Sequence, residues 1–170
     1  MSDKMYDEVP VKGKIKYTKG DWKEYAVHDE KNIKGFFGEY MFLSNFFESP
    51  VYYKDILYRS SENAYQASKI EEGFRGHLAN CTPYQSKKLW KDFPSIDKSA
   101  QEWDERKYKV MAEIVFMKFC NDELKEKLLA TGDKYLEETN HWNDVSWGVC
   151  NGKGENNLGK ILMKIRDFWK

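Results

Sequence analysis

The sequence predicts a single helix-rich α+β domain whose short strands lie mainly in its N-terminal third. Before residue 60, apolar and polar residues alternate over short stretches, which is typical of strands. After residue 100, apolar residues recur every three to four positions, as in amphipathic helices. The 170 residues contain no repeat and suit one hydrophobic core. Strands followed by a run of helices favour the α+β class.

The first thirty residues are expected to form an extension that contains a β-hairpin. Across residues 11–18, Val11, Ile15 and Tyr17 alternate with lysines, as on a half-buried edge strand. Residues 19–21 indicate a turn, and residues 22–28 indicate a returning strand. The predicted organisation is therefore an extension over residues 1–30 and one domain over residues 31–170.

A second pair of strands and a helix are expected after residue 50. Residues 51–53 and 56–58 are apolar strand candidates on either side of a turn at Asp55. A helix follows over residues 60–69, with Ser60 or Ser61 as its N-cap, because a serine hydroxyl accepts a hydrogen bond from the first turn. Residues 71–102 are polar and interrupted by glycine and proline, so short helices and loops are expected there.

The remainder of the chain is expected to be mostly helical. Helices are predicted over residues 103–119 and 122–130, a short strand over 134–139, and a last helix from Asn156. Their predicted buried stripes are Trp103, Val110, Ile114 and Met117 in the first helix, Leu124, Leu128 and Leu129 in the second, and Leu158, Ile161, Leu162, Ile165 and Phe168 in the last.

Composition excludes several classes of protein. The 28 basic and 28 acidic residues cancel, which argues against a dedicated duplex-DNA binder but not against a pocket for one nucleotide. No apolar run approaches the ~18 residues of a membrane span, and the N-terminus lacks the apolar core of a signal peptide, so a cytoplasmic location is expected. The three cysteines and three histidines are scattered, so neither a disulfide scaffold nor a metal site is predicted.

A polar stripe on the helix at residues 60–69 is the first candidate for chemistry. Glu62, Gln66 and Lys69 lie at i, i+4 and i+7, which places them on one face. A carboxylate, an amide and an amine in a row are suited to acid, base or nucleophile chemistry, although charge at this spacing is also typical of a solvated face. The aromatic share of 16% indicates that some rings line a pocket or replace aliphatic residues in the core.

Five segments in a fixed order resemble the NADAR family, also called YbiA-like, over roughly residues 35–168. They are Leu-Ser-Asn-Phe at 43–46, Ser-Ser-Glu-x-x-x-Gln-Ala-x-Lys at 60–69, Trp-x-x-x-Lys-x-x-Val-Met from 103, Asn-Asp-Val-Ser-Trp-Gly at 143–148 and Gly-Lys-Gly-Glu-Asn-Asn-Leu-Gly-Lys-Ile-Leu-Met at 152–163. The family resemblance implies the α+β fold of YbiA-like proteins and action on N-glycosidic bonds of ribosyl compounds.

Two enzymatic activities and one binding role follow from the resemblance. The first is removal of ADP-ribose from a modified guanine base in nucleic acid. An alternative is hydrolysis of riboflavin-pathway pyrimidine ribosyl phosphates, and another is non-catalytic binding of nucleotides derived from NAD. The substrate is thus expected to be a ribosylated nucleotide or ADP-ribosylated nucleic acid, with no cofactor, no metal and no membrane involved.

The same resemblance implies the site residues. Glu62, Lys69 and Asp144 are expected to be catalytic, and Ser44, Asn45, Phe46, Gln66, Trp103, Trp147, Gly148 and Asn156 to bind substrate. Glu62 would protonate the leaving base or stabilise a cation-like sugar carbon. Lys69 would attack C1 of the ribose to form a Schiff base, or remain charged and bind sugar or phosphate oxygens.

Structural alternatives stay open for several of these residues. Trp103 would also serve as core packing on its own helix, and Asp144 as a loop aspartate that caps local backbone. Ser44 and Asn45 would bind the sugar or fix a turn. Asn156 is predicted to cap the last helix, whose N-terminus and preceding glycines would then also form a phosphate seat.

Three positions depart from the family pattern. Asn63 stands where a histidine often follows the helix glutamate, Glu155 replaces a common lysine before the motif asparagine, and Ala100 lies near the place of a frequent arginine. These differences affect charge near a phosphorylated substrate, so they bear on substrate identity more than on fold.

Overall fold

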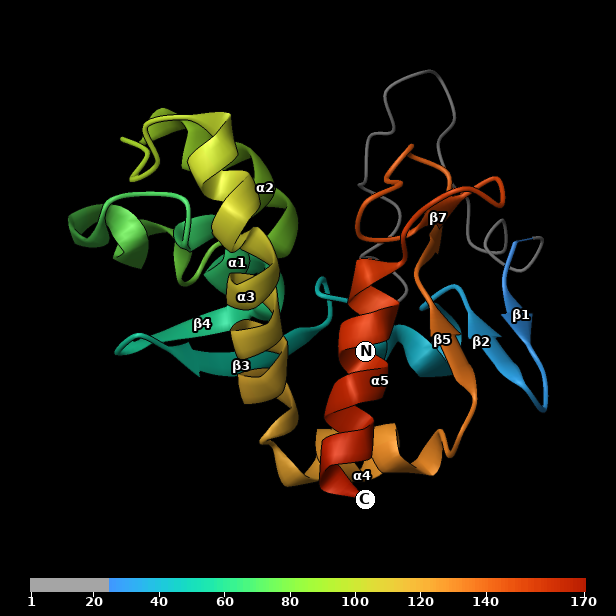
Figure 1. Cartoon of the computed structure of the whole chain (residues 1–170). Helices are drawn as coiled ribbons and strands as arrows, with labels where there is room; N and C mark the ends of the chain where they lie inside the picture. The colour runs from blue at the N-terminus through green and yellow to red at the C-terminus, as the bar shows by residue number, and fades with distance from the viewer. Residues whose placement is uncertain (1–24) are drawn as a thin grey trace. The chain divides into compact units, whose positions relative to one another are not determined.

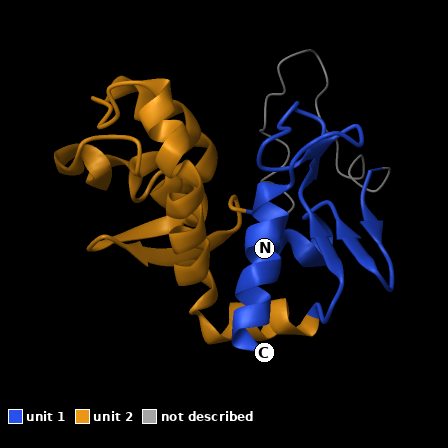
Figure 2. Cartoon of the chain, viewed as in Figure 1, with its two compact units in different colours: residues 1–44, 131–170 blue, residues 45–130 orange. Residues whose placement is uncertain are grey.

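The computed structural model describes residues 25–170, which divide into two compact units (Figure 2). The first contains the chain up to residue 44 together with residues 131–170, and the second contains residues 45–130. The predicted hairpin at residues 11–28 lies outside the described residues except for its end, where Val27–His28 form strand β1.

The second unit begins with a β-hairpin, β3 (Glu48–Tyr53) and β4 (Ile56–Ser60), paired antiparallel with Val51 opposite Tyr58 (Figure 1). Alternate residues of β3 are buried, as a sheet with one covered face requires. Lys54 and Asp55 both have positive φ, 47° and 64°, which matches the twist of a two-residue hairpin turn. The predicted strands and turn are confirmed.

Helix α1 (Ser61–Ala67) follows β4 directly and is buried on all sides. The Ser60 hydroxyl accepts a hydrogen bond from Asn63 N at 3.2 Å, which confirms the predicted N-cap. The helix packs against the β3–β4 hairpin and against η4 (Glu72–Leu78), α2 (Pro83–Leu89) and α3 (Ala100–Phe119). Ala64 and Ala67 are fully buried, because small side chains allow this close approach.

Long helix α3 supplies much of the core of the second unit. Its buried face carries Val110, Met111, Ile114, Val115, Lys118 and Phe119. The prediction that Met117 is buried is wrong, since it is 37% exposed. Each residue turns the helix by about 100°, so a face centred on Ile114 and Lys118 leaves Met117 at its edge. The short helix η5 (Trp90–Asp92) lies between α2 and α3, and α4 (Asp122–Ala130) follows α3.

The first unit combines short strands with one amphipathic helix. Strand β2 (Asn32–Lys34) pairs with β1 and runs parallel to β5 (Tyr135–Glu137), while β6 (Thr139–Asn140) runs parallel to β7 (Val149–Cys150). A 3-10 helix, η3 (Gly38–Leu43), follows β2. Helix α5 (Asn157–Trp169) packs on β5.

The buried stripe of α5 is confirmed at Leu158, Leu162 and Ile165. Phe168 is 68% exposed, so its predicted burial is wrong. A helix of 13 residues is about 20 Å long, whereas a strand of three residues is about 10 Å long. The last turn of α5 therefore extends beyond the strand that covers its apolar face.

The observed elements confirm the helix-rich α+β class. Four of the seven described strands precede residue 61, and the predicted strand at 134–139 corresponds to β5 and the start of β6. Across residues 25–170, none of the helices has the length and apolar character needed to cross a membrane.

Candidate active site

The predicted polar stripe of α1 is a buried row of hydrogen bonds. Gln66 Nε2 donates to Glu62 Oε1 at 2.7 Å, and Lys69 Nζ donates to Gln66 Oε1 at 2.7 Å. Glu62 is only 6% exposed and Gln66 only 3%. The solvated-face alternative is therefore wrong, and a carboxylate and an amine are held on either side of one amide.

The Lys69 amine lies among three aromatic rings. Its Nζ atom is 4.5 Å from the ring centroid of Trp90, 5.0 Å from that of Tyr65 and 5.4 Å from that of Trp103. A charged ammonium has three N–H donors, and the Gln66 oxygen is the one hydrogen-bond acceptor that residues 25–170 provide for it. The surroundings thus satisfy a neutral amine better than an ammonium in its hydrogen bonds, although ring faces attract a cation.

Burial lowers the pKa of Lys69 from 10.5 to about 8. Removal of water from the charged form is the largest cause, and the positive charges of Lys87 and Lys91 act in the same direction. The Glu62 carboxylate acts in the opposite direction, but burial outweighs it. With this pKa, roughly one amine in ten is neutral at pH 7, against about one in three thousand for an ordinary lysine.

The Glu62 carboxylate keeps one oxygen for further chemistry. Its Oε1 accepts from Gln66, while no described residue donates to Oε2. Its backbone N–H donates to Asn45 O at 3.0 Å, which fixes the first turn of α1. Helix α1 ends at Ala67, two residues before the predicted end, so the free carboxylate oxygen comes from α1 and the partly neutral amine from the turn that follows it.

Sequence reasoning missed Trp90, Lys87 and Lys91. All three come from α2 and η5, a segment predicted only as short helices and loops. The Lys87 amine also lies 5.4 Å from the ring centroid of Phe46, a predicted binding residue. A tryptophan three residues after Lys87 and directly before Lys91 was the available signal, but only the packing of α2 on α1 brings them to Lys69.

The Asn45 side chain forms hydrogen bonds to the first turn of α1 and to α3. Its Oδ1 accepts from Ser61 Oγ at 2.9 Å, and its Nδ2 contacts Met111 Sδ at 3.2 Å. Because the side chain is 7% exposed and both polar atoms have partners, this geometry supports the turn-fixing alternative. Ser44, the last residue of the first unit, donates its backbone N–H to Met41 O at 3.0 Å.

Asn63, which departs from the family pattern, also has a structural explanation. Its Nδ2 donates to Leu78 O at 2.8 Å and to Cys81 O at 2.9 Å. The residue is fully buried and ties α1 to the segment after η4. Its side-chain amide thus has a structural role within the core, and its effect on charge near a substrate remains a prediction.

In the first unit, Asp144 organises the loop before β7. Its Oδ1 accepts from Trp147 N at 2.8 Å and from Ser146 N at 3.2 Å. Asn140 clamps the same residue, since its Nδ2 donates to Asp144 O at 2.7 Å and its Oδ1 accepts from Asp144 N at 3.1 Å. This is the local-cap alternative for Asp144, and it leaves the second carboxylate oxygen available.

The loop that carries Trp147 is hydrogen-bonded to the start of α5. Trp147 O accepts from Leu158 N at 3.0 Å, and Ser146 O accepts from Asn157 N at 3.3 Å. The first two amides of the helix are thus already used, so the phosphate seat predicted there has lost two of its donors.

Asn156 does not cap α5 with its side chain, and that prediction is wrong. The residue adopts a left-handed conformation with φ 54°. Its Nδ2 donates to Leu136 O and Tyr135 Oη at 2.9 and 3.0 Å, and its Oδ1 accepts from Glu138 N at 3.1 Å. The amide thus joins the start of α5 to the strands instead of closing the helix end.

Gly148 allows a close approach of backbone segments. A Cβ at this position would overlap the carbonyl oxygen of Glu138 and crowd the side-chain amide of Asn140. The glycine is therefore required for the packing of the loop on the strand, which explains its place in the motif without a contact to substrate.

The predicted site residues thus fall into two groups. Glu62, Gln66, Lys69 and Trp103 come together in the second unit, which also contains Asn45 and Phe46. The first unit contains Ser44, Asp144, Trp147, Gly148 and Asn156. Within residues 25–170, no three histidine, cysteine or acidic side chains gather as a metal site would require.

The second unit also has a groove that none of Glu62, Gln66 and Lys69 lines. It is lined by the turn of the β3–β4 hairpin and by α3, including Tyr53, Glu113 and Met117. Tyr53 Oη donates to Glu113 Oε2 at 2.7 Å. None of the predicted site residues lines it, so the Lys69 cluster is the better candidate.

This arrangement of motifs and fold defines a class of YbiA-like α+β proteins. The structure matches the NMR structure of the Escherichia coli protein YbiA with a TM-score of 0.70 and 28% identity, over 85% of this chain and 88% of that one. Residues 27–169 match the family model of the NADAR domain. The chain belongs to the NADAR family, as its motifs predict.

Curated relatives carry names that refer to glycosidic bonds or to riboflavin. The chain is 33% identical to N-glycosidase Npun_R5314 of Nostoc punctiforme over 73% of this chain and 82% of that protein. It is 31% identical to N-glycosidase YbiA of Escherichia coli K12 over 76% and 81%. It is 34% identical to the riboflavin biosynthesis protein VVA0006 of Vibrio vulnificus over 74% of this chain but only 35% of that protein.

Proposed function

We propose that this protein is an N-glycosidase that hydrolyses the bond between a base and a ribosyl group, with ADP-ribosylated guanine in nucleic acid as its first candidate substrate. The observation that carries this proposal is the buried row of Glu62, Gln66 and Lys69 with a lowered Lys69 pKa. A binding protein has no need of an amine with an altered pKa beside a carboxylate. The names of the relatives support the same reaction class.

The proposed reaction begins with the neutral Lys69 amine attacking C1 of the ribose. As the C1–N bond to the base breaks, the Glu62 carboxylate takes a proton from the attacking nitrogen and passes it to the departing base nitrogen. Opening of the sugar ring, with a proton transferred to the ring oxygen, gives an imine between C1 and Nζ. Water adds to C1 and releases the free sugar aldehyde, which restores the amine.

The proton inventory of the pair agrees with this sequence. The reactive pair is the neutral Lys69 amine and the Glu62 carboxylate, because the amine itself carries the proton that Glu62 passes to the base. The lowered Lys69 pKa raises the fraction of the amine that is already neutral at pH 7. Gln66 holds the two residues by hydrogen bonds, through its amide nitrogen to Glu62 and its amide oxygen to Lys69. An amide does not transfer protons near neutral pH, so Gln66 cannot replace Glu62 as acid or base.

The experiment that tests the proposal is trapping of the imine. Full-length protein is incubated with an ADP-ribosylated guanine oligonucleotide and borohydride, and the mass of the peptide that contains Lys69 is measured. A ribosyl adduct on Lys69 is expected, together with release of base in the absence of borohydride. Lys69→Ala should abolish release and Glu62→Gln should lower it about a hundredfold, while the far-UV spectrum is preserved in both. Tight binding of substrate with no release would instead support the non-catalytic binder.

A second candidate substrate is a riboflavin-pathway pyrimidine ribosyl phosphate. It is favoured by the name of the Vibrio relative, although the match covers only a third of that protein. The same assay with this compound in place of the oligonucleotide separates the two substrates. The catalytic role predicted for Asp144 and the binding role predicted for Trp147 remain predictions, which Asp144→Asn and Trp147→Phe test in that assay.

A further inference from the structure

Lys69 is held by a backbone segment that lies far from it in the sequence. Ile96 N donates to Lys69 O at 3.1 Å, Glu71 N donates to Pro94 O at 3.0 Å, and Ile70 forms an isolated β-bridge with Ser95. Residues 69–71 and 94–96 therefore pair like short strands. The position of the Lys69 main chain depends on this pairing.

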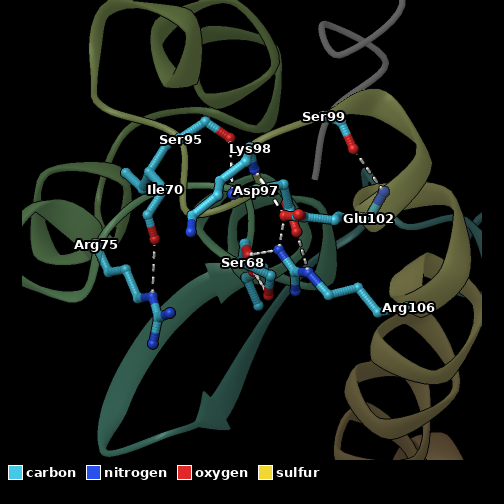
Figure 3. A network of polar contacts seen from close by, with 10 residues as sticks. Ser68, Ile70, Arg75, Ser95, Asp97, Lys98, Ser99, Glu102 and Arg106 are labelled. Carbon is cyan, nitrogen blue, oxygen red and sulfur yellow. Dashed lines mark hydrogen bonds and ion pairs between the residues drawn. The ribbon is translucent and has the colours of Figure 1, made fainter.

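Arg106 joins this segment to the end of α1. Its Nε and Nη2 atoms donate to the two oxygens of Asp97, each at 2.7 Å, and Nη2 also donates to Ser68 O at 2.7 Å (Figure 3). The Asp97 side chain is 8% exposed and the Arg106 side chain 27%, so the carboxylate is shielded from solvent and the guanidinium is partly shielded. The residue before Lys69 and the residue after Ile96 are thus fixed by one guanidinium group.

The same guanidinium also packs on the ring that borders Lys69. Arg106 Cζ lies 4.6 Å from the ring centroid of Trp103, and the other ring contacts of Trp103 are to Tyr65 at 5.3 Å and to the Lys69 amine at 5.4 Å. Arg106 therefore contacts both the main chain beside Lys69 and one of the three rings that exclude water from its amine. Lysine cannot reproduce these contacts, because an ammonium is neither planar nor bidentate.

We propose that the Asp97–Arg106 pair is a positioning device that keeps the Lys69 amine in its dry aromatic surroundings. The catalytic meaning of this proposal rests on the proposed function. The effect of the pair on the Lys69 pKa, however, requires no substrate. Neither residue contacts the Lys69 amine, so both act through Trp103 and the backbone. Loss of the pair loosens the contact between Trp103 and Lys69 and lets water reach the amine.

The expected consequence has a definite sign. Burial is the main cause of the lowered Lys69 pKa, so entry of water raises that pKa toward its ordinary value. The charged groups that act on the amine, Glu62, Lys87 and Lys91, are untouched by changes at Asp97 or Arg106. A purely structural role would lower the melting temperature and leave the Lys69 pKa where it is.

The test is competitive acetylation of full-length protein across pH, with the extent of labelling at Lys69 read by mass spectrometry. Arg106→Lys and Asp97→Asn should each raise the Lys69 pKa by about one unit, so that the neutral amine at pH 7 and kcat/KM fall by about tenfold. Activity should recover at pH 10. The double variant should be no worse than either single variant, because each breaks the same pair.

Arg75→Lys is the matched control. Arg75 donates to Ile70 O at 3.3 Å in the same network (Figure 3), and it makes no hydrogen bond, ion pair or ring contact with Asp97 or Trp103. It should leave the Lys69 labelling curve unchanged. If Arg106→Lys does not fold, Asp97→Asn, which retains one acceptor oxygen, decides the question.

An unchanged Lys69 labelling curve in a folded Arg106 or Asp97 variant would overturn the proposal. Because labelling requires no substrate, this failure is distinct from failure of the proposed function. A raised Lys69 pKa in the variants, with no turnover of any ribosyl compound by the wild type, would uphold the positioning role and refute only the N-glycosidase assignment.

Discussion

The two groups of motif residues use their polar side chains in opposite ways. In the second unit, Glu62, Gln66 and Lys69 bond side chain to side chain, and an amine and a carboxylate oxygen keep unused capacity. In the first unit, Asp144 and Asn156 bond mainly to backbone groups of the loop and strands. Motif membership alone therefore does not distinguish a reactive residue from one that shapes a loop.

This difference shows which hydrogen-bonding patterns indicate a reactive residue. A buried polar group whose partners are main-chain atoms is satisfied and contributes to folding. A buried amine with one acceptor and three rings is costly to charge, and proteins retain such groups mostly where function requires them. The strongest tests therefore change a residue in one unit and ask whether activity or stability responds.

Lys69→Met gives the largest expected effect. It removes the nucleophile but keeps an apolar stem of similar length, so turnover should fall at least about a thousandfold. The melting temperature at pH 7 should stay level or rise, since a buried ionisable group is replaced by an apolar one. Lys98→Met, at an exposed lysine of the same unit, is the control and should retain activity. More than a tenth of wild-type turnover in Lys69→Met would contradict the site.

Glu62→Gln tests the link between carboxylate and amine. Turnover should fall about a hundredfold with loss of the acid. The Lys69 pKa should drop below 8, because Glu62 raises it in the wild type. In the wild type the active amine is the deprotonated one, so kcat/KM should rise with pH and level off above about 8; in the variant this limb should move to lower pH.

The control for that prediction is Glu71→Gln. Glu71 is an exposed acid two residues beyond Lys69, and it is not among the charges that act on the Lys69 amine. Its variant should reproduce the wild-type profile. A rising limb that stays at the same pH in Glu62→Gln would show that the carboxylate and the amine are uncoupled.

Asn156→Ala should affect stability more than chemistry. It removes three hydrogen bonds of a buried amide and places alanine at φ 54°, so a loss of about 2–4 kcal/mol in unfolding free energy is expected. Urea denaturation measures it. Asn151→Ala, at an exposed left-handed residue with φ 51°, should cost only about 1 kcal/mol. Equal losses in the two variants would mean that the buried hydrogen bonds contribute nothing.

The smallest effects are expected at Met117 and Phe168, one apolar residue in each unit. Both are exposed, so Met117→Gln and Phe168→Gln should each change the unfolding free energy by no more than about 0.5 kcal/mol. Ile114→Ala, at a fully buried position of the same helix as Met117, should cost about 2–5 kcal/mol. A loss of about 1 kcal/mol or more at either residue would indicate that it is packed in the core, as its helical spacing predicts.

Much of the fold was predictable because local signals agree with it. The hairpin at residues 48–60, the cap at Ser60 and the helices α3, α4 and α5 follow from alternation, capping chemistry and periodicity. Met117 and Phe168 were misassigned because spacing defines a helix face but not how far the neighbouring elements cover it.

The site was predictable only in part. The stripe of Glu62, Gln66 and Lys69 follows from helical spacing, and its burial does not. Trp90 escaped notice because it belongs to a short helix next to α2, and its place is decided by the packing of α2 on α1. Asn156 was assigned to a cap because its position before α5 is right, whereas its left-handed backbone directs the amide to the strands.

By itself, the sequence determined the family, the order of the elements and the row of polar residues on α1. Only the tertiary structure decided that this row is buried, that Trp90, Tyr65 and Trp103 surround the amine, and that burial outweighs the Glu62 charge in setting the Lys69 pKa. The physical reason is that periodicity is a local property of the chain, whereas exclusion of water requires side chains from several segments to meet at one atom.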